Sequence, residues 1–247
     1  QDKILVHHMN SLYLMDLNGE LTKLPYHHFQ QVYNPQFNHD GSSILMSLPN
    51  TNTDLIVSSG LGREASLTVS SNNETPFGRL SPDGKRLAFV SYRQGYPQVY
   101  VQDEYTSTLI FTNPNRLPIY RSPVWHSNNS QIAFAAENQL LTYSFADQQL
   151  TAVQMPDSFT AVLDWYPKSQ QLLIAEKQQN QTYFSQYSLS DSRMRKLASS
   201  GVNFSVRLDS RGQLVYRKGQ QLRWGEQEYD LSPESSGPFI PYKGRVY

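Results

Sequence analysis

The sequence predicts an all-β protein made of repeated sheets, and three observations lead to this prediction. A turn signal recurs along the 247 residues, each time just before a short apolar run: Asp40–Gly41, Asp83–Gly84, Asn128–Asn129, Lys168–Ser169 and Arg211–Gly212. The first residues of these turns are 43, 45, 40 and 43 positions apart. The chain also contains 16 Tyr and 11 Phe, and aromatic residues favour strands. A period this steady indicates repeats of one sheet unit.

Each repeat reads as four short strands within about 40 residues, which is the size of a β-propeller blade. We therefore expect one domain, 1–247, folded as a six-bladed propeller of four-stranded antiparallel blades. The blades are predicted at residues 1–32 with 239–247, 33–74, 75–117, 118–156, 157–200 and 201–236. The first of them lacks an inner strand, and the C-terminal strand is expected to supply it, because an open sheet edge is unfavourable. The alternative is a linker, since Pro238 and Pro241 interrupt this segment.

Composition excludes several classes of partner and site. Lys and Arg total 21 and so do Asp and Glu, so the net charge is zero. Without a basic excess, neither nucleic acid nor an anionic membrane surface is expected to bind. The absence of Cys excludes disulfides, thiolate catalysis and cysteine-ligated zinc. No apolar run reaches the ~20 residues that span a bilayer, so any transmembrane segment is expected upstream of Gln1, in a longer protein.

Two columns of residues are expected on the inner strands. Three positions before each turn stands a large apolar residue that should pack between blades: Phe37, Leu80, Trp125, Trp165 and Leu208. One position earlier, on the opposite face of each strand, four of five residues are polar: Gln36, Arg79, Asp164 and Arg207. These four are predicted to bind an anion or a small ligand at the axis. The alternative is a set of internal ion pairs and hydrogen bonds, because a buried charge needs a partner.

The segments that lead into the inner strands carry aromatic residues and arginine, the composition of binding hot spots. They predict a rim that binds a partner through Tyr33, Phe77, Arg116, Tyr120, Arg121 and Phe159. The alternative is that these side chains only cover the ends of the blades.

Catalytic motifs are missing from the sequence. It contains no Gly-x-Ser-x-Gly nucleophile elbow and no Gly-rich phosphate loop. Asp40 and Asp83 are interpreted as turn residues that cap their own backbone. The adjacent pairs His7–His8 and His27–His28 send neighbours to opposite faces of a strand, which disfavours one shared metal ion. We expect no enzyme activity, no cofactor and no metal.

Residues 81–103, SPDGKRLAFVSYRQGYPQVYVQD, resemble the repeat of the TolB-like β-propellers. The other units match that repeat by their spacing and apolar pattern. The resemblance extends to the extracytoplasmic propellers of membrane-anchored winged-helix regulators of the cadaverine-regulator type. It implies a periplasmic sensor or interaction domain that binds a protein or a small-molecule signal and catalyses nothing. The alternatives are a periplasmic scaffold for an envelope protein and a propeller-type lyase or hydrolase.

Overall fold

The computed structural model describes residues 3–8, 11–16, 20–24, 33–37, 43–49, 53–59, 65–69, 77–179, 181–200, 206–230, 241–242 and 245–246. All regular structure in these ranges is β-strand, and no helix long and apolar enough to cross a membrane occurs in them. The chain forms two compact units, one of residues 77–204 and one of residues 1–76 with 205–247.

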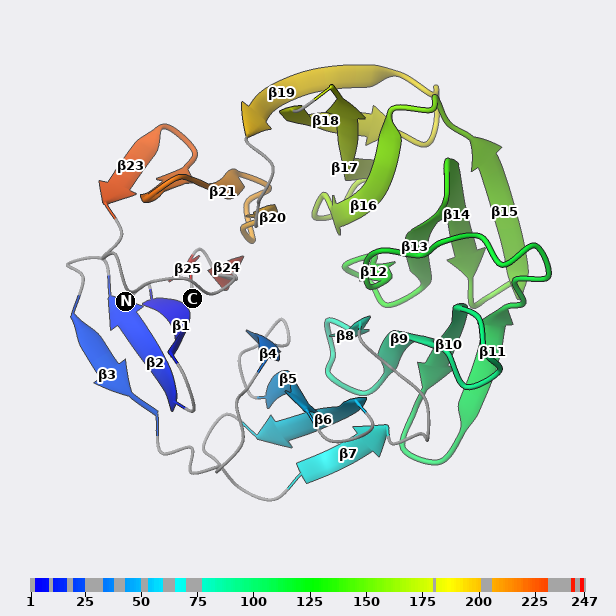
Figure 1. Ribbon diagram of the computed structural model, residues 1–247, viewed down its shortest axis with the longest axis horizontal. Helices are drawn as coiled ribbons and strands as arrows, with labels where there is room; N and C mark the ends of the chain where they lie inside the picture. The colour runs from blue at the N-terminus through cyan, green and yellow to red at the C-terminus, as the bar shows by residue number, and fades with distance from the viewer. Residues whose placement is uncertain are drawn as a thin grey trace. The chain divides into compact units, whose positions relative to one another are not determined.

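The unit 77–204 contains three four-stranded antiparallel sheets in which the strands pair in chain order (Figure 1). The first sheet consists of β8 (Phe77–Leu80), β9 (Leu87–Ser91), β10 (Gln98–Gln102) and β11 (Ser107–Phe111). The second consists of β12 (Val124–Trp125), β13 (Gln131–Ala136), β14 (Gln139–Ser144) and β15 (Gln149–Gln154). The third consists of β16 (Phe159–Trp165), β17 (Gln171–Gln178), β18 (Gln181–Ser188) and β19 (Met194–Ser200).

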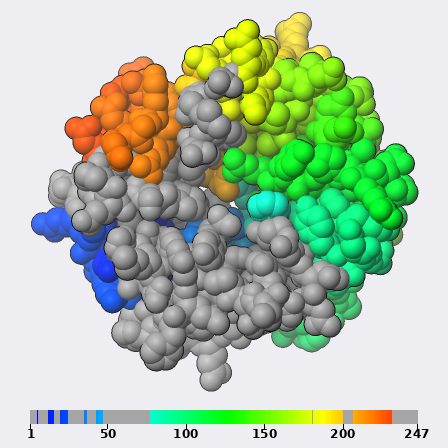
Figure 2. Space-filling view, viewed as in Figure 1, coloured from blue at the N-terminus to red at the C-terminus, as the bar shows by residue number. Residues whose placement is uncertain are grey.

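The core of this unit lies between its sheets. The second strands β9, β13 and β17 are apolar on both faces and almost entirely buried, because each is covered on both sides by neighbouring side chains. One cluster joins Val99 of the first sheet to Trp125 of the second, and another joins Leu140 of the second sheet to Trp165 of the third. The space-filling view shows these sheets packed side by side (Figure 2). Burial of apolar surface between neighbouring sheets therefore holds the unit together.

The predicted apolar column is confirmed where its side chains are described. Leu80, Trp125, Trp165 and Leu208 are all buried at the ends of their strands. The side chain of Phe37 lies outside the described residues. Both Trp residues therefore serve packing.

The other unit contains the remaining sheets. One has four strands, β4 (Tyr33–Phe37), β5 (Ser43–Pro49), β6 (Thr53–Ser59) and β7 (Ala65–Val69). A second has four strands, β20 (Val206–Leu208), β21 (Leu214–Lys218), β22 (Gln221–Trp224) and β23 (Gln227–Asp230). A third has three, β1 (Lys3–His8), β2 (Ser11–Asp16) and β3 (Leu21–Lys23), and the last is the pair β24 (Pro241–Tyr242) and β25 (Arg245–Val246).

The prediction of six four-stranded blades is wrong. Four such blades follow one another from β8 to β23, and β4–β7 form a further four-stranded sheet, but the described strands β1–β3 form a sheet of three. The C-terminal strand does not complete that sheet. Instead β24 pairs with β25, with Tyr242 opposite Arg245, so the hairpin uses these backbone groups itself. β25 lies beside β1 but is not hydrogen-bonded into its sheet.

Candidate functional site

One end of the sheets in unit 77–204 is formed by three short turns. Each joins the first strand of a sheet to the second, and antiparallel pairing places all such turns at the same end of their sheets. We call this end the turn face and define it by turns 81–86, 126–130 and 166–170. These are the turn signals by which the repeats were recognised in the sequence.

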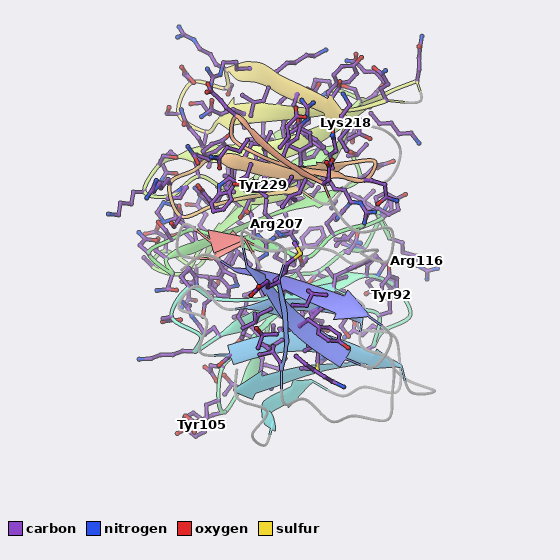
Figure 3. The ribbon with its side chains drawn as sticks, turned by 90° about the vertical axis from the view of Figure 1, so that its left-hand side faces the viewer. Tyr92, Tyr105, Arg116, Arg207, Lys218 and Tyr229 are labelled. Atoms are coloured by element: carbon purple, nitrogen blue, oxygen red, sulfur yellow. The ribbon has the colours of Figure 1, made fainter. Side chains whose placement is uncertain are left out.

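The opposite end is formed by longer segments. Loop 92–97 joins β9 to β10, and the connection 112–123 leads from the first sheet to the second. We call this end the connection face. Figure 3 shows Tyr92 and Arg116 at this end of the unit and Tyr105 at the other.

Side chains close the first two turns of the turn face. In turn 81–86, Asp83 Oδ1 accepts the Ser81 hydroxyl at 2.6 Å and the Lys85 N–H at 3.1 Å. In turn 126–130, Asn128 Oδ1 accepts the Ser130 N–H at 3.0 Å. The interpretation of Asp83 as a turn residue is therefore confirmed, whereas Asp40 lies outside the described residues.

Hydrogen bonds also join each turn to the next. The Asp83 N–H donates to Asn129 Oδ1 at 3.2 Å, and the Arg86 guanidinium donates to the Asn129 carbonyl. In the same way the Lys168 N–H donates to Ser127 Oγ at 3.1 Å. The turns of three neighbouring sheets thus form one hydrogen-bonded row, which fixes the spacing between them.

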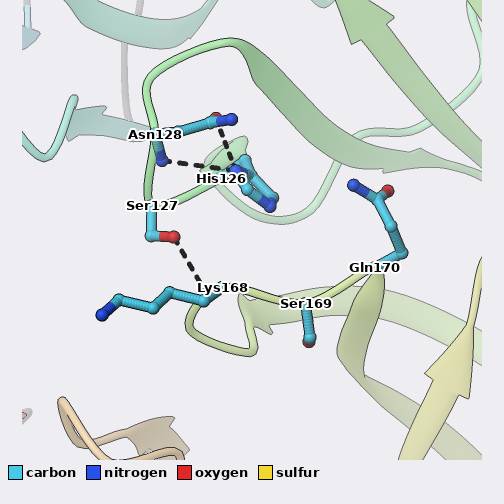
Figure 4. Close-up of a pocket in the computed structure, with 6 residues that line it drawn as sticks. All are labelled: His126, Ser127, Asn128, Lys168, Ser169 and Gln170. Atoms are coloured by element: carbon cyan, nitrogen blue, oxygen red, sulfur yellow. Dashed lines mark hydrogen bonds between the residues drawn. The ribbon is translucent and has the colours of Figure 1, made fainter.

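A pocket of about 360 Å³ opens between the second and third turns of this row (Figure 4). It is lined by His126, Ser127, Asn128, Lys168, Ser169 and Gln170. Sequence reasoning did not find this site. The signal is weak, because the two halves of the pocket come from different repeats and neither half is distinctive alone.

Two members of the predicted axial column, Arg79 and Asp164, form an ion pair. Arg79 lies on β8 and Asp164 on β16, and their side chains meet at 3.0 Å with only 13% and 17% of their surfaces exposed. The Arg79 guanidinium also donates to the Leu163 carbonyl at 3.3 Å, and the Arg79 carbonyl accepts the indole N–H of Trp125 at 2.9 Å. Arg79 therefore joins the inner strands of all three sheets of this unit.

The other two members belong to the second unit. Gln36 is partly buried on β4, and the Arg207 guanidinium donates to the Val206 carbonyl at 3.1 Å on β20. The prediction that the four residues bind a ligand stays a prediction.

Other ionisable groups near this pair have altered pKa values. Burial lowers the pKa of Arg121, and the nearby charge of Arg79 lowers it further. Burial also raises the pKa of Tyr166 to about 12, with a further contribution from Asp164, while Arg195 acts in the opposite direction. With a pKa of about 12, Tyr166 keeps its proton near neutral pH and is not suited to act as a general base.

The predicted rim residues have different environments. On the connection 112–123, Tyr120 is 63% exposed and Arg116 is exposed, with its guanidinium 5.8 Å from the centre of the Tyr96 ring. Arg121, on the same connection, is half-buried, and so is Phe77, on β8. These four residues belong to one unit and three of them to one segment.

Phe159 and Tyr33 do not support the predicted rim. Phe159 is 3% exposed and packs in the core between the second and third sheets, so the structure places it away from any surface. The prediction failed because β16 begins at Phe159, earlier relative to its turn than β8 does. The side chain of Tyr33 lies outside the described residues.

The connection face is held in place by a residue that sequence reasoning missed. Asn113 is fully buried, and its side-chain amide donates to the Pro97 carbonyl at 2.9 Å and to the Leu117 carbonyl at 2.8 Å. Its Oδ1 accepts the Leu117 N–H at 2.9 Å. This single side chain ties loop 92–97 to the connection 112–123 and so fixes the backbone beneath Tyr96 and Arg116.

Among the described residues, no group of three or more His, Cys, Asp or Glu side chains is placed to hold a metal ion. The buried carboxylate of Glu176 is occupied by two hydroxyls, those of Ser185 at 2.6 Å and Ser158 at 3.3 Å. In this part of the chain the geometry provides surfaces and a pocket suited to binding.

No family model matches the chain, and no curated protein matches its sequence. Solved structures match its fold. TolB from Acinetobacter baumannii superposes with a TM-score of 0.69 at 14% identity, over 99% of this chain and 62% of that one. A protein assigned as TolB from Agrobacterium tumefaciens gives 0.62 at 14% identity, over 100% of this chain and 87% of that one.

A chain of the mitotic checkpoint complex also matches, with a TM-score of 0.58 at 15% identity, over 90% of this chain and 83% of that one. The chain spans less than two thirds of the Acinetobacter TolB. At such identities the likeness shows the fold alone, which is that of a TolB-like β-propeller.

Proposed function

We propose that this chain is a non-catalytic β-propeller that binds another protein through the connection face. The observation that carries this proposal is the combination of exposed Tyr120 and Arg116 with a backbone fixed by buried Asn113. Tyrosine and arginine contribute most of the energy at protein interfaces, and a preordered surface loses little conformational entropy on binding.

The electrostatics of this face fit a protein partner. Arg116 lies near the Tyr96 ring, and the Arg93 guanidinium lies 4.2 Å from the centre of the Tyr100 ring. Guanidinium groups stacked on aromatic rings lose little hydration on contact and keep donors for carboxylates and carbonyls. Glu137 and Asp157 are also exposed on this side of the unit, so the face carries both signs of charge. A polyanion would meet repulsion there, whereas the mixed surface of a folded protein would not.

For the biological setting, we propose the periplasm, and more narrowly the sensor or interaction domain of a membrane-anchored transcriptional regulator. Two features support this: the resemblance of residues 81–103 to the TolB-like repeat, and the fold shared with TolB structures. A scaffold that contacts an envelope protein is the alternative, and it would use the same face. Fusing the native full-length protein after this domain to alkaline phosphatase tests the compartment, because the phosphatase is active only after export.

The binding proposal is tested by site-specific photo-cross-linking in the native cell. A photoreactive phenylalanine analogue replaces Tyr120 in one variant and Tyr105 in another. Tyr105 is the matched control, because it lies on the opposite side of the same unit and is more exposed, 85% against 63%. We expect one discrete protein adduct from position 120 and none from position 105. Equal adducts from both positions, or none from position 120, would contradict the proposal.

A further inference from the structure

The pocket on the turn face has the size of a small-molecule site and is separate from the connection face. Its volume of about 360 Å³ suits a ligand of monosaccharide size. Its walls come from turn 126–130 of the second sheet and turn 166–170 of the third. The hydrogen bond from the Lys168 N–H to Ser127 Oγ joins the two turns and forms one boundary of the pocket.

His126 presents an unused polar atom to this pocket. The residue is only 6% exposed, and its ring packs edge-on against Trp165 with 4.9 Å between the ring centres. Its Nδ1 contacts Asn128 Oδ1 at 2.5 Å and the Asn128 backbone N–H at 3.3 Å, so Nδ1 is engaged within its own turn. Nε2 has no partner among the described residues, and it is not shut off from solvent. Figure 4 shows this side of the ring turned to the space between the turns.

Gln170 provides the facing polar group. Figure 4 shows its side chain directed toward the His126 ring across the opening. The side-chain amide forms no hydrogen bond within the described part of the chain, so two N–H donors and one carbonyl acceptor are available. The Nε2 atom of an imidazole accepts or donates a hydrogen bond according to its tautomer, and a hydroxyl group can pair with it in either case. The two side chains together match a ligand with hydroxyl groups, which both donate and accept.

Lys168 gives the pocket its charge. It occupies the position of Asp83 and Asn128 in the other two turns, but a lysine cannot accept the hydrogen bonds that close those turns. Its backbone has a φ of 54°, and its exposed side chain forms no hydrogen bond or ion pair within the described part of the chain. No carboxylate lines the pocket, and Lys168 is the one lysine or arginine in its lining.

From this arrangement we propose that the turn face binds a small polyhydroxylated carboxylate, of the chemical class of the sugar acids. The hydroxyl groups are held between His126 and Gln170, and the Lys168 side chain folds over the carboxylate. A phosphate ester fits less well, since the lining contains one lysine and no arginine that could bind a phosphate through two nitrogens. The site is independent of the proposed protein interface and does not rest on it.

The proposal is tested with gluconate as the probe, measured by isothermal titration calorimetry. Glucose, which lacks the carboxylate, and inorganic phosphate, which lacks the polyol, are titrated in parallel. We expect gluconate to bind with a dissociation constant on the order of 1 mM. Lys168→Gln should weaken binding about fivefold, as expected for one exposed ion pair, and Gln170→Glu about tenfold or more. Lys85→Gln, on the turn of the first sheet, is the matched control and should leave the affinity unchanged.

A second readout locates the ligand. In protein labelled with ¹⁵N at histidine, the His126 ring is assigned by its loss in His126→Gln, and gluconate should shift its Nε2 resonance. Failure of gluconate to saturate at about 10 mM would overturn the proposal. Equal affinity in wild type and both pocket variants would do so as well, as would binding of phosphate or glucose as tight as that of gluconate.

Discussion

The turn face and the connection face are made by the same strands, yet they differ in chemistry. On the turn face, turns 81–86 and 126–130 are closed by the short polar side chains of Asp83 and Asn128. On the connection face, Tyr96, Arg116 and Tyr120 are large, and the residue that orders them is buried beneath. Repetition of the sheets therefore constrains the turn face and the connection face differently.

The length of the segments explains the difference. A turn within a sheet is short in every repeat, because it joins two adjacent antiparallel strands. A connection between sheets has no such limit: the first runs over 112–123, whereas the next runs only over 155–158. A protein-binding surface can therefore develop on a long connection without disturbing the sheets. The turns of the turn face stay short, which leaves room only for a small pocket.

The largest expected effect comes from removing the support of the connection face. Asn113→Ala deletes three hydrogen bonds at a fully buried position and leaves backbone groups of Pro97 and Leu117 without partners. We expect the free energy of unfolding to fall by about 3 kcal/mol. Urea denaturation measures this loss, and amide exchange at Leu117 should accelerate more than exchange on the turn face. Asn115→Ala, an exposed asparagine of the same connection, is the control; a similar loss in both variants would contradict the role of Asn113.

A somewhat smaller effect is expected at the ion pair between the inner strands β8 and β16. Arg79→Met leaves Asp164 without its guanidinium partner in a largely buried position, so stability should fall by about 2 kcal/mol. The double variant Arg79→Met/Asp164→Leu should recover most of this loss, because no unpaired charge remains. A double-mutant cycle in urea measures the coupling. Additive losses would show that the two side chains do not stabilise each other.

The smallest expected effect has the opposite sign. Lys168→Asn replaces a lysine at φ 54° by a residue that tolerates this conformation better. The free energy of unfolding should rise by about 0.5–1 kcal/mol, read as a higher urea midpoint, while the affinity for gluconate falls. Lys85→Asn, at an exposed position that contributes only its backbone N–H to turn 81–86, should change neither quantity. A gain in stability without a loss of gluconate affinity would show that the Lys168 side chain does not contribute to ligand binding in the pocket.

The sequence predicted the repeat well because each turn carries a local signal. Asp83 and Gly84 determine their turn within a few residues, and the apolar column follows from strand alternation. The pairing of Arg79 with Asp164 was one of two open interpretations, since the sequence shows the charges but not their distance.

Features that depend on distant contacts were missed. Asn113 is ordinary in its local context and is distinguished only by its bond to Pro97, which the fold brings close. Phe159 was misplaced because local pattern does not show where a strand begins. The wrong prediction that the C-terminal strand completes the β1–β3 sheet has the same origin: among the described residues β24 and β25 pair with each other, and no local signal separates this hairpin from a closing strand.

The central claim is that the connection face binds a protein. Its most direct test is to titrate the partner identified by cross-linking against purified variants of this chain. Tyr120→Ser should weaken binding at least about tenfold, because removal of a hot-spot tyrosine costs about 1.4 kcal/mol or more. Tyr105→Ser, on the opposite side of the unit, should bind like wild type. If Tyr105→Ser weakens binding and Tyr120→Ser does not, the partner binds the other face and the account is contradicted.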